Sequence, residues 1–548
     1  MGARCILLGL DGATYDLLDP WMDAGILPHL KDLLSRGGKG VLRSTDPPTT
    51  PPAWTSVLTG VNPGKHGIFD FRDSFHRDPR RPLVSSRSMK APRIWQLLNA
   101  EGLRTAIMNV PITYPPEPVD GFMISGMMTP NDDVEYTYPT EMKSRLDAMV
   151  GHYVVDVDIP RYDVEIWSDA QVFFADVERA FTRRSQAFLR LLEEERWDFF
   201  MVVFVIIDRI QHLFWKYLVP EFEQYHTELG ARVREKVTAL FTLVDHTIGA
   251  VIERLDESTT LLLCSDHGFG GTRAWFNVNR WLEREGLLTL IPSVRWKKQL
   301  FYTLMAWNDS SLVKTVVPRS VQSAIRGRIR AGRSTYKTDV LGTVDWVHTK
   351  AFFASIPSQG IYINRERVPE GEREGLRSRI RDGLLGLKDP ATGLPFVDRV
   401  MFPEEIYTGP ETSFAPDVLF VAQDYGYLGR QLFGASQVVE TSLHTPNGFH
   451  RVGGIFGAYG AGVTCGKVVQ GAAVHDVTAT VLYTLNQPVP TYMDGHPLLE
   501  VFTPQHRASH PVHVGGGEGY HEAQRGHEYS AEEQRELEER LRRLGYMG

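Results

Sequence analysis

The chain has 548 residues, of which 42% are hydrophobic and 23% charged, and its formal net charge is -8. This composition is that of an ordinary globular protein with a large core, and the negative charge gives no overall attraction to nucleic acid. No apolar run reaches the roughly 18 residues that a membrane-spanning helix needs.

The cysteines indicate a reducing compartment. There are three, Cys5, Cys264 and Cys465, far apart in the sequence, and the first two lie in apolar, strand-like runs. This placement favours small buried hydrophobic residues over a disulfide framework or a zinc motif. The apolar stretch at the N-terminus is too short for a secretory signal, so we expect a cytoplasmic protein.

The first strand is predicted at residues 5–10, and Asp11 follows its carboxyl end. An aspartate at this point either caps a turn or binds a metal ion. Residues 27–37 have apolar side chains at helical spacing and end in a glycine, which predicts a helix that covers the sheet.

The segment 44–60 places a hydroxyl at the start of a helix. Pro51 and Pro52 mark the first turn, with Thr50 at or near the N-cap and Gly60 near the end. Unpaired backbone N–H groups at such a start can bind an anion, and the hydroxyl can serve as a nucleophile. Threonine is also a common N-cap with no further role.

The chain then alternates between helix and strand. A buried strand predicted at 199–207 ends in Asp208, and His212 follows four residues later. If a helical turn begins there, both side chains lie on one face and can reach one cation. The preceding elements are predicted as a helix at 93–100, a strand at 105–110 and helical periodicity at 170–195.

The apolar run 261–264 ends abruptly in Asp266-His267. It is typical of a central strand buried on both faces, reached through a long helix predicted at 220–255. Open α/β sheets place their sites at the carboxyl ends of the strands, so a carboxylate and an imidazole leave the core together there.

Residues 293–339 interrupt this pattern, because basic side chains alternate with apolar ones and acids are almost absent. Such a segment inside an acidic protein indicates an insertion that meets an anionic partner such as a membrane surface, or a solvated helical lid. Residues 275–282 before it are predicted as a loop followed by a helix.

The alternation resumes with strands at 351–354, 360–364 and 417–421 and helices at 370–385 and 474–485. His444 and His450, in a predicted polar loop before a strand, are both candidate ligands. The tail after residue 504 is polar, ends in a charged helix at 530–544, and is predicted to be peripheral.

The ordered set of these residues resembles the two-metal site of the alkaline phosphatase superfamily, and most closely its type I phosphodiesterase/nucleotide pyrophosphatase family. The set comprises Asp11, Thr50, the D-x-x-x-H pair Asp208 and His212, the pair Asp266-His267, and a late histidine. Segments 59–68 and 490–495 also match, and the resemblance spans about residues 4–500 without the basic segment.

The resemblance implies that Asp208, His212 and the late histidine hold one zinc ion, and that a second group holds the other. His450 is preferred as the late ligand because it precedes the Gly453-Gly454 strand, with His444 as the alternative. The second group consists of Asp11, Asp266 and His267.

Thr50 is then the nucleophile, near both ions, with Thr49 the next candidate. Where the family carries an asparagine after the His-Gly-Ile stretch, this chain reads Phe69-Asp70-Phe71.

The resemblance further implies an α/β fold, a three-layer sandwich with a central, mostly parallel sheet. The expected cofactors are two divalent ions, zinc or manganese, and the expected substrate is a small-molecule, lipid or nucleotide phosphoester. Two alternatives stay open: a phosphomonoesterase, and a non-catalytic scaffold that binds anions or membranes. No nucleic-acid partner is expected.

Four regions are predicted: a catalytic core in two parts at 1–292 and 340–504, the basic insertion or lid at 293–339, and a polar tail at 505–548.

Overall fold

The structure is a computed structural model. It describes residues 2–159, 162–292, 341–432, 437–440, 448–515 and 529–547. The basic segment 293–339 and His444 lie outside the described residues. The chain forms two compact units: the first is Met1–Gly271, Ile406–Ala415 and Pro446–Leu544, and the second is Thr272–Glu405, Pro416–Thr445 and Gly545–Gly548.

The first unit contains, among its described residues, a nine-stranded sheet with the order β18-β2-β17-β7-β1-β6-β3-β4-β5. Strands β7, β1, β6, β3 and β4 are parallel, whereas β17 and β5 run antiparallel to their neighbours. The predicted mostly parallel sheet is therefore confirmed. The strands are β1 (Arg4–Leu10), β2 (Gly38–Arg43), β3 (Thr105–Val110), β4 (Gly121–Ser125), β5 (Thr137–Tyr138), β6 (Phe199–Phe204), β7 (Thr259–Cys264), β17 (Gly453–Gly460) and β18 (Lys467–Val469).

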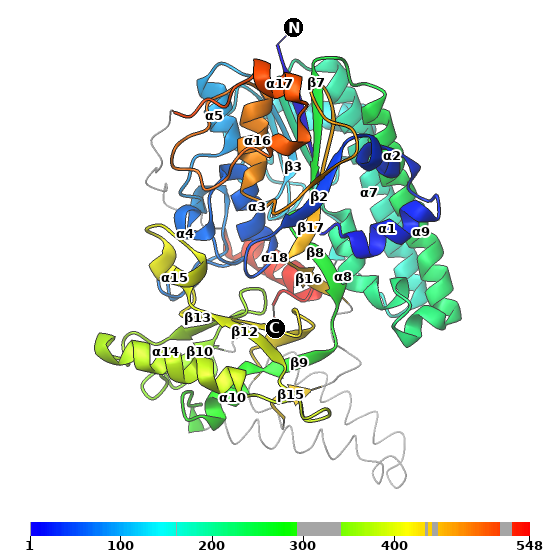
Figure 1. Cartoon of the computed structure of the whole chain (residues 1–548). Helices are drawn as coiled ribbons and strands as arrows, with labels where there is room; N and C mark the ends of the chain where they lie inside the picture. The colour runs from blue at the N-terminus through cyan, green and yellow to red at the C-terminus, as the bar shows by residue number, and fades with distance from the viewer. Residues whose placement is uncertain are drawn as a thin grey trace. The chain divides into compact units, whose positions relative to one another are not determined.

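Helices cover both faces of this sheet, as the predicted three-layer arrangement requires. Figure 1 shows α2, α7 and α9 on one side and α3, α5 and α16 on the other. The helices of this unit are α1 (Tyr15–Asp23), α2 (Pro28–Arg36), α3 (Thr50–Thr59), α4 (Pro63–His66), α5 (Ile94–Ala100), α6 (Glu141–Val150), α7 (Trp167–Glu194), α8 (Ile206–Leu218), α9 (Glu228–Ile252), α16 (Asp476–Thr484), α17 (Pro504–Ser509) and α18 (Ala531–Arg543).

The three central strands explain where a site can form. Every residue of β6 and β7 is buried, and so is β1 after its first residue. Such continuous apolar strands are typical of a parallel sheet covered on both faces. Because β1 lies between β6 and β7 and runs parallel to both, the three strands end at the same edge of the sheet.

The predicted strand at 199–207 is too long, because β6 ends at Phe204 and α8 begins at Ile206. The apolar run continues across this boundary, since Ile206, Ile207 and Ile210 pack inward from the helix. An unbroken apolar run does not distinguish a strand from the buried first turn of a helix. The start of α8 here gives Asp208 and His212 the common helix face that the spacing predicted.

A two-stranded ribbon adds a further side chain to this edge. Strand β8 (Gly268–Gly271) pairs antiparallel with β16 (Gly448–Arg451), so that His450 lies opposite Phe269. His450 therefore lies in a strand, whereas the sequence predicted a polar loop.

The helix at the end of the chain is packed more tightly than predicted. Leu537 and Leu541 of α18 are each 1% exposed, and the Tyr529 hydroxyl donates to the backbone oxygen of Met128 at 3.1 Å. Ser530 and Glu533 form a capping box at the start of the helix. The predicted peripheral tail therefore contains a helix whose short apolar stripe is buried.

The second unit has a four-stranded antiparallel sheet of order β10-β11-β13-β12 and a three-stranded sheet of order β14-β9-β15. The loop predicted at the start of 275–282 is instead part of strand β9, which forms because it pairs with segments far along the chain. The elements are β9 (Ala274–Asn277), α10 (Val278–Arg284), β10 (Ala351–Phe353), β11 (Gly360–Ile363), α14 (Glu370–Leu385), β12 (Val397–Met401), β13 (Val418–Ala422), β14 (Tyr427–Arg430) and β15 (Val439–Glu440). The short helix α15 (Pro403–Ile406) spans the boundary of the units in sequence.

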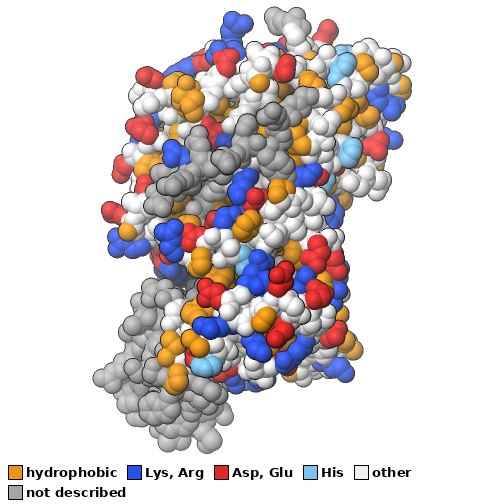
Figure 2. Space-filling model, turned by 90° about the vertical axis from the view of Figure 1, so that its left-hand side faces the viewer, with side chains coloured by type: hydrophobic (Ala, Val, Ile, Leu, Met, Phe, Trp, Pro, Cys, Tyr) orange, Lys and Arg blue, Asp and Glu red, His pale blue; other side chains and the backbone are white. Residues whose placement is uncertain are grey.

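Basic and acidic side chains of the described residues are interspersed on the face shown in Figure 2. Among the described residues, no helix combines the length and the apolar character needed to cross a bilayer.

Candidate metal centre

The predicted ligands that the structure describes meet at the carboxyl edge of the central strands. Asp11 follows β1, the pair Asp266-His267 follows β7, and Asp208 and His212 lie in the first turns of α8. His450 reaches the same place from β16. All six side chains are buried, with at most 3% of their surface exposed.

Each of the three histidines is oriented by a backbone carbonyl. Because a carbonyl oxygen can only accept, the ring nitrogen Nδ1 that faces it must carry the proton, which leaves Nε2 with a lone pair. The pairs are His212 with Gly448 (3.2 Å), His267 with Gly268 (3.1 Å) and His450 with Pro48 (2.8 Å). This arrangement is the one that orients histidine for binding a metal ion through Nε2.

Each of the three carboxylates likewise has one oxygen held by an N–H donor. The donors are Trp54 Nε1 to Asp11 Oδ2 (2.9 Å), Arg209 to Asp208 Oδ2 (3.0 Å) and the backbone N–H of Gly12 to Asp266 Oδ1 (3.3 Å). The other oxygen of each carboxylate faces a histidine. Three oxygens and three nitrogens therefore converge with lone pairs toward one another.

Asp208, His212 and His450 form a compact group. The Nε2 atoms of the two histidines lie 3.0 Å apart, and they are 3.2 Å and 3.3 Å from Asp208 Oδ1. Ligand atoms about 2.0 Å from a tetrahedral zinc ion lie roughly 3.3 Å apart. The separations in this group thus match the spacing of a tetrahedral ligand set.

The second group forms around His267. Its Nε2 lies 3.2 Å from Asp266 Oδ2 and 3.7 Å from Asp11 Oδ1. Asp11, Asp208 and His267 also offer ligand atoms that all lie within 4.8 Å of one another. The two groups therefore adjoin, with Asp208 within reach of both.

Thr50 is the first residue of α3, and Thr49 is its N-cap. The Thr50 hydroxyl lies 3.2 Å from His267 Nε2 and is 1% exposed. Since this nitrogen is an acceptor, the hydroxyl donates to it and points into the second group. Pro51 and Pro52 carry no N–H, so this helix start offers fewer backbone donors to an anion than a typical one.

Burial and neighbouring charges shift the pKa values of these groups in opposite directions. Burial and the nearby Asp208 carboxylate raise the pKa of Asp11 well above its usual value, and burial and the Asp11 charge do the same for Asp266. Burial would also raise the pKa of Asp208, but His212 and His450 hold it well below the usual value.

Burial lowers the pKa of His267 well below its usual value, and it lowers the pKa of His450 to about 4. These two imidazoles are therefore neutral at physiological pH, the form in which histidine binds metal ions.

These observations fit divalent metal ions. Asp11 Oδ1 and Asp266 Oδ2 are buried and have no hydrogen-bond partner among the described residues. Buried carboxylates clustered without a counter-charge are destabilising unless a cation or protons occupy the space between them. Carboxylate oxygen and imidazole nitrogen together are the ligands of zinc and related ions.

The segment Phe69-Asp70-Phe71 is part of the packed interior. Asp70 pairs with Arg81 at 2.9 Å, both buried, and Phe71 is 1% exposed in the core. Phe71 therefore offers no polar side chain to a substrate.

Sequence reasoning did not identify two residues that hold the carboxylates. Trp54 lies one helical turn after Thr50, so both project from one face of α3. Arg209 adjoins Asp208 in the first turn of α8. Both could have been identified from the sequence, because each is a hydrogen-bond donor located one helical turn from the candidate nucleophile or next to a candidate ligand.

Comparisons with known proteins identify a family and similar folds. A sequence profile of the family described as type I phosphodiesterase / nucleotide pyrophosphatase matches residues 5–419. No curated protein sequence is similar enough to the chain to match it.

Similar folds occur among solved structures. Phosphonoacetate hydrolase from Sinorhizobium meliloti 1021, in complex with phosphonoformate, aligns with a TM-score of 0.53 and 15% identity over 88% of this chain and 95% of that chain. Its complex with phosphonoacetate gives a TM-score of 0.52 at the same identity and coverage. Murine ectonucleotide pyrophosphatase / phosphodiesterase 5 aligns with a TM-score of 0.48 and 14% identity over 90% of this chain and 96% of that chain. The first two alignments confirm the predicted alkaline-phosphatase-like fold.

Proposed function

The chain belongs to the type I phosphodiesterase / nucleotide pyrophosphatase family, and we propose that it is a metal-dependent phosphodiesterase or nucleotide pyrophosphatase with a threonine nucleophile. The observation that carries this proposal is the convergence of three carboxylate oxygens and three imidazole nitrogens at one edge of the sheet, with the Thr50 hydroxyl 3.2 Å from one of them, His267 Nε2. A buried set of this kind is suited to binding divalent ions beside a nucleophile.

Two groups of residues would hold the ions. Asp208, His212 and His450 form one, and Asp11, Asp266 and His267 form the other, with zinc or manganese as the expected metals. When bound, such ions promote ionisation of a hydroxyl and neutralise the negative charge of a phosphoryl group. Two divalent ions would also balance the three carboxylates and a threonine alkoxide.

Thr50 is the group that attacks phosphorus in this proposal. Its oxygen forms the new P–O bond, the bond to the leaving oxygen breaks, and that oxygen leaves as an alcohol or phosphate. The covalent intermediate is a phosphothreonine, which keeps the second ester group when the substrate is a diester. A water molecule then attacks the same phosphorus, phosphate or a phosphomonoester departs, and the Thr50 hydroxyl is restored.

The surrounding residues keep this geometry fixed. Burial excludes bulk water from the ligands, while Trp54 holds Asp11 and Arg209 holds Asp208 through hydrogen bonds of 2.9 and 3.0 Å. Pre-organised groups of this kind need little reorganisation during the reaction.

A two-part experiment tests the proposed function. Bound metal is measured by elemental analysis of the purified full-length protein, and initial rates are compared on bis-p-nitrophenyl phosphate and p-nitrophenyl phosphate. We expect about two zinc or manganese ions per chain and faster hydrolysis of the diester. Faster hydrolysis of the monoester would identify a phosphatase, and neither metal nor turnover would support a non-catalytic scaffold.

A further inference from the structure

A row of alternating charges extends from the candidate metal centre to the end of the chain. It begins at Asp208, continues through Arg209 and Asp156, and ends at Arg540 in the last turns of α18. The row lies within the first unit. Only its first member belongs to the proposed ligand set.

Arg209 joins the first two carboxylates of the row. It is 1% exposed, and its Nη1 donates to Asp208 Oδ2 at 3.0 Å while its Nη2 donates to Asp156 Oδ2 at 2.9 Å. The guanidinium is planar and rigid, so the position of one carboxylate constrains that of the other. By holding Oδ2, Arg209 leaves Oδ1 of Asp208 directed at His212 and His450.

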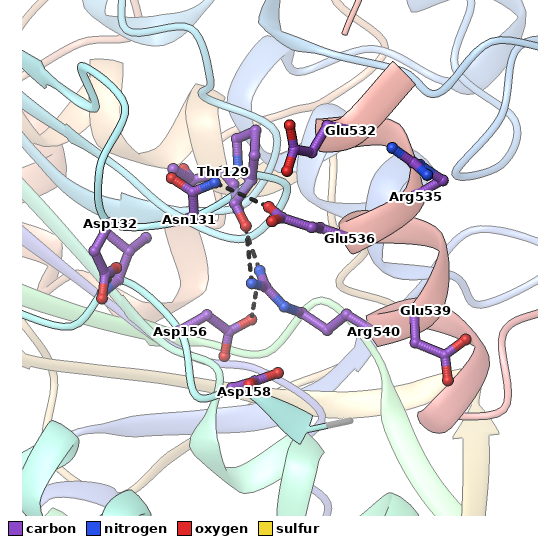
Figure 3. Close-up of a pocket in the computed structure, with 12 residues that line it drawn as sticks. Thr129, Asn131, Asp132, Asp156, Asp158, Glu532, Arg535, Glu536, Glu539 and Arg540 are labelled. Atoms are coloured by element: carbon purple, nitrogen blue, oxygen red, sulfur yellow. Dashed lines mark hydrogen bonds and ion pairs between the residues drawn. The ribbon is translucent and has the colours of Figure 1, made fainter. Parts of the chain in front are cut away.

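Arg540 forms the outer end of the row. Its Nη1 donates to the backbone oxygen of Thr129 at 3.1 Å, and its Nη2 donates to that of Pro130 at 3.0 Å. Nη1 also lies 3.9 Å from Asp156 Oδ2. Figure 3 shows the Arg540 side chain crossing from the helix toward Asp156 and the 129–130 backbone. Asp156 thus lies between two guanidinium groups, and its own Oδ1 accepts from the backbone of Val157.

The row borders a cavity of about 620 Å³ beneath α18. Asp156 and Arg540 both line this cavity, together with further acidic residues of α18 such as Glu536 and Glu539 (Figure 3). Arg540 is 12% exposed at its side chain, whereas Asp156 is 4% exposed. The outer end of the row is therefore in reach of solvent, and the inner end is not.

We propose that Asp156 and Arg540 are positioning residues of the metal centre, acting on Asp208 through Arg209. This inference rests on the proposed function. With Asp156 in place, the positive charge of Arg209 is shared between two carboxylates. Without Asp156, the Arg209 guanidinium pairs with Asp208 alone, which makes the Asp208 carboxylate a weaker metal ligand. The guanidinium is then also held less firmly in its orientation.

The test measures zinc affinity rather than turnover. The full-length protein is stripped with a chelator, and the zinc dissociation constant is then measured by competition with a chromophoric chelator. In Arg540→Met we expect zinc affinity to fall about 10-fold, at the lower end of the range for residues that support metal ligands. Arg540→Lys keeps the charge and is expected to recover part of that loss.

Glu538→Gln is the matched control. Glu538 lies on the same helix and pairs with Arg72, so the variant removes an ion pair that docks α18 without touching the row. We expect its zinc affinity to equal that of the unaltered protein. An equal loss in Glu538→Gln and Arg540→Met would overturn the inference, because docking of the helix alone would then explain both.

Asp156→Asn tests the middle of the row with a side chain of the same shape. We expect a loss of zinc affinity of about 10-fold or more, with the fold checked by circular dichroism. If the unaltered protein binds zinc and both Arg540→Met and Asp156→Asn bind it equally well, the inference is wrong while the proposed function stands. If the unaltered protein binds neither zinc nor manganese, the proposed function itself fails.

Discussion

Two sets of buried carboxylates in the first unit differ in what balances their charge. Asp11 and Asp266 lie beside other acidic groups, so burial and like charge raise their pKa values. Burial would raise the pKa of Asp156 as well, but Arg209 and Arg540 outweigh it, and the pKa lies below the usual value. The three side chains are nearly equally buried, at 1%, 0% and 4% exposure.

The comparison shows that the chain provides its own cations for one set and not for the other. Asp156 accepts from Arg209 and from a backbone N–H. Asp11 and Asp266 each keep one buried oxygen without a hydrogen-bond partner among the described residues. Such an arrangement is destabilising by itself and becomes favourable when a cation binds.

Asp208 belongs to both regions, and its removal should have the largest effect. In Asp208→Ala, the inward oxygen is lost from the metal centre and Arg209 loses one of its two partners. We expect turnover to fall by at least about 1,000-fold, together with loss of bound metal. Elemental analysis and initial rates on bis-p-nitrophenyl phosphate measure both; retention of both metals at full occupancy would contradict the assignment.

Thr50→Ala removes the proposed nucleophile of the metal centre and leaves its metal ligands unchanged. Because the nucleophile is removed while the six ligands stay in place, we expect turnover to fall by about 1,000-fold or more with metal content unchanged. Thr49→Ala, at the neighbouring N-cap, is the control and should keep turnover within a few-fold of the unaltered protein. If instead the Thr49 variant is inactive and the Thr50 variant active, the two roles are exchanged.

Asp156→Asn tests the set that the chain balances itself. Breaking a buried ion pair costs about 3 to 5 kcal/mol of unfolding free energy. The folded pKa of Asp156 lies below the usual 3.8. The full difference in unfolding free energy between the variant and the unaltered protein should therefore be present at neutral pH, and it should shrink as the pH falls below about 4. Denaturant unfolding in the presence of a chelator, repeated across pH, measures it; a loss that does not change with pH would argue against the ion pair.

Asp11→Asn should increase the unfolding free energy of the metal-free protein, and this is the smallest of the expected effects. Its folded pKa lies above the usual 3.8, so ionised Asp11 destabilises the metal-free protein. We expect the variant to be more stable than the unaltered protein by about 1 kcal/mol in chelator, with the gain appearing as the pH rises above about 4. Adding zinc should reverse the order, since the variant has lost a ligand; a gain that survives zinc would remove Asp11 from the ligand set.

Much of the site was predictable because its residue types follow recognisable strands. The apolar runs that became β1, β6 and β7 each end in a carboxylate or an Asp-His pair, and parallel strands bring their carboxyl ends together. The four-residue spacing of Asp208 and His212 likewise required only that a helix begin there. The compartment, the metal and a membrane role for residues 293–339 stay predictions.

Other features depended on contacts between distant segments. Periodicity did not separate the end of β6 from the start of α8, because the apolar residues continue through both. Strand β9 could not be predicted, because its hydrogen bonds come from β14 and β15. The buried stripe of α18 consists of few residues within a charged sequence. Its packing against the rest of the first unit could therefore not be predicted from the sequence.

The sequence by itself determined which side chains are available for metal chemistry and the order in which the strands deliver them, because local apolar runs and turn residues encode both. Only the tertiary structure decided which atom of each ligand faces the candidate metal centre. Trp54, Arg209 and the backbone N–H of Gly12 each hold one carboxylate oxygen, and three backbone carbonyls fix the histidine rings. These partners come from distant parts of the chain, so no local pattern specifies them; they become neighbours only when the sheet and its helices pack together.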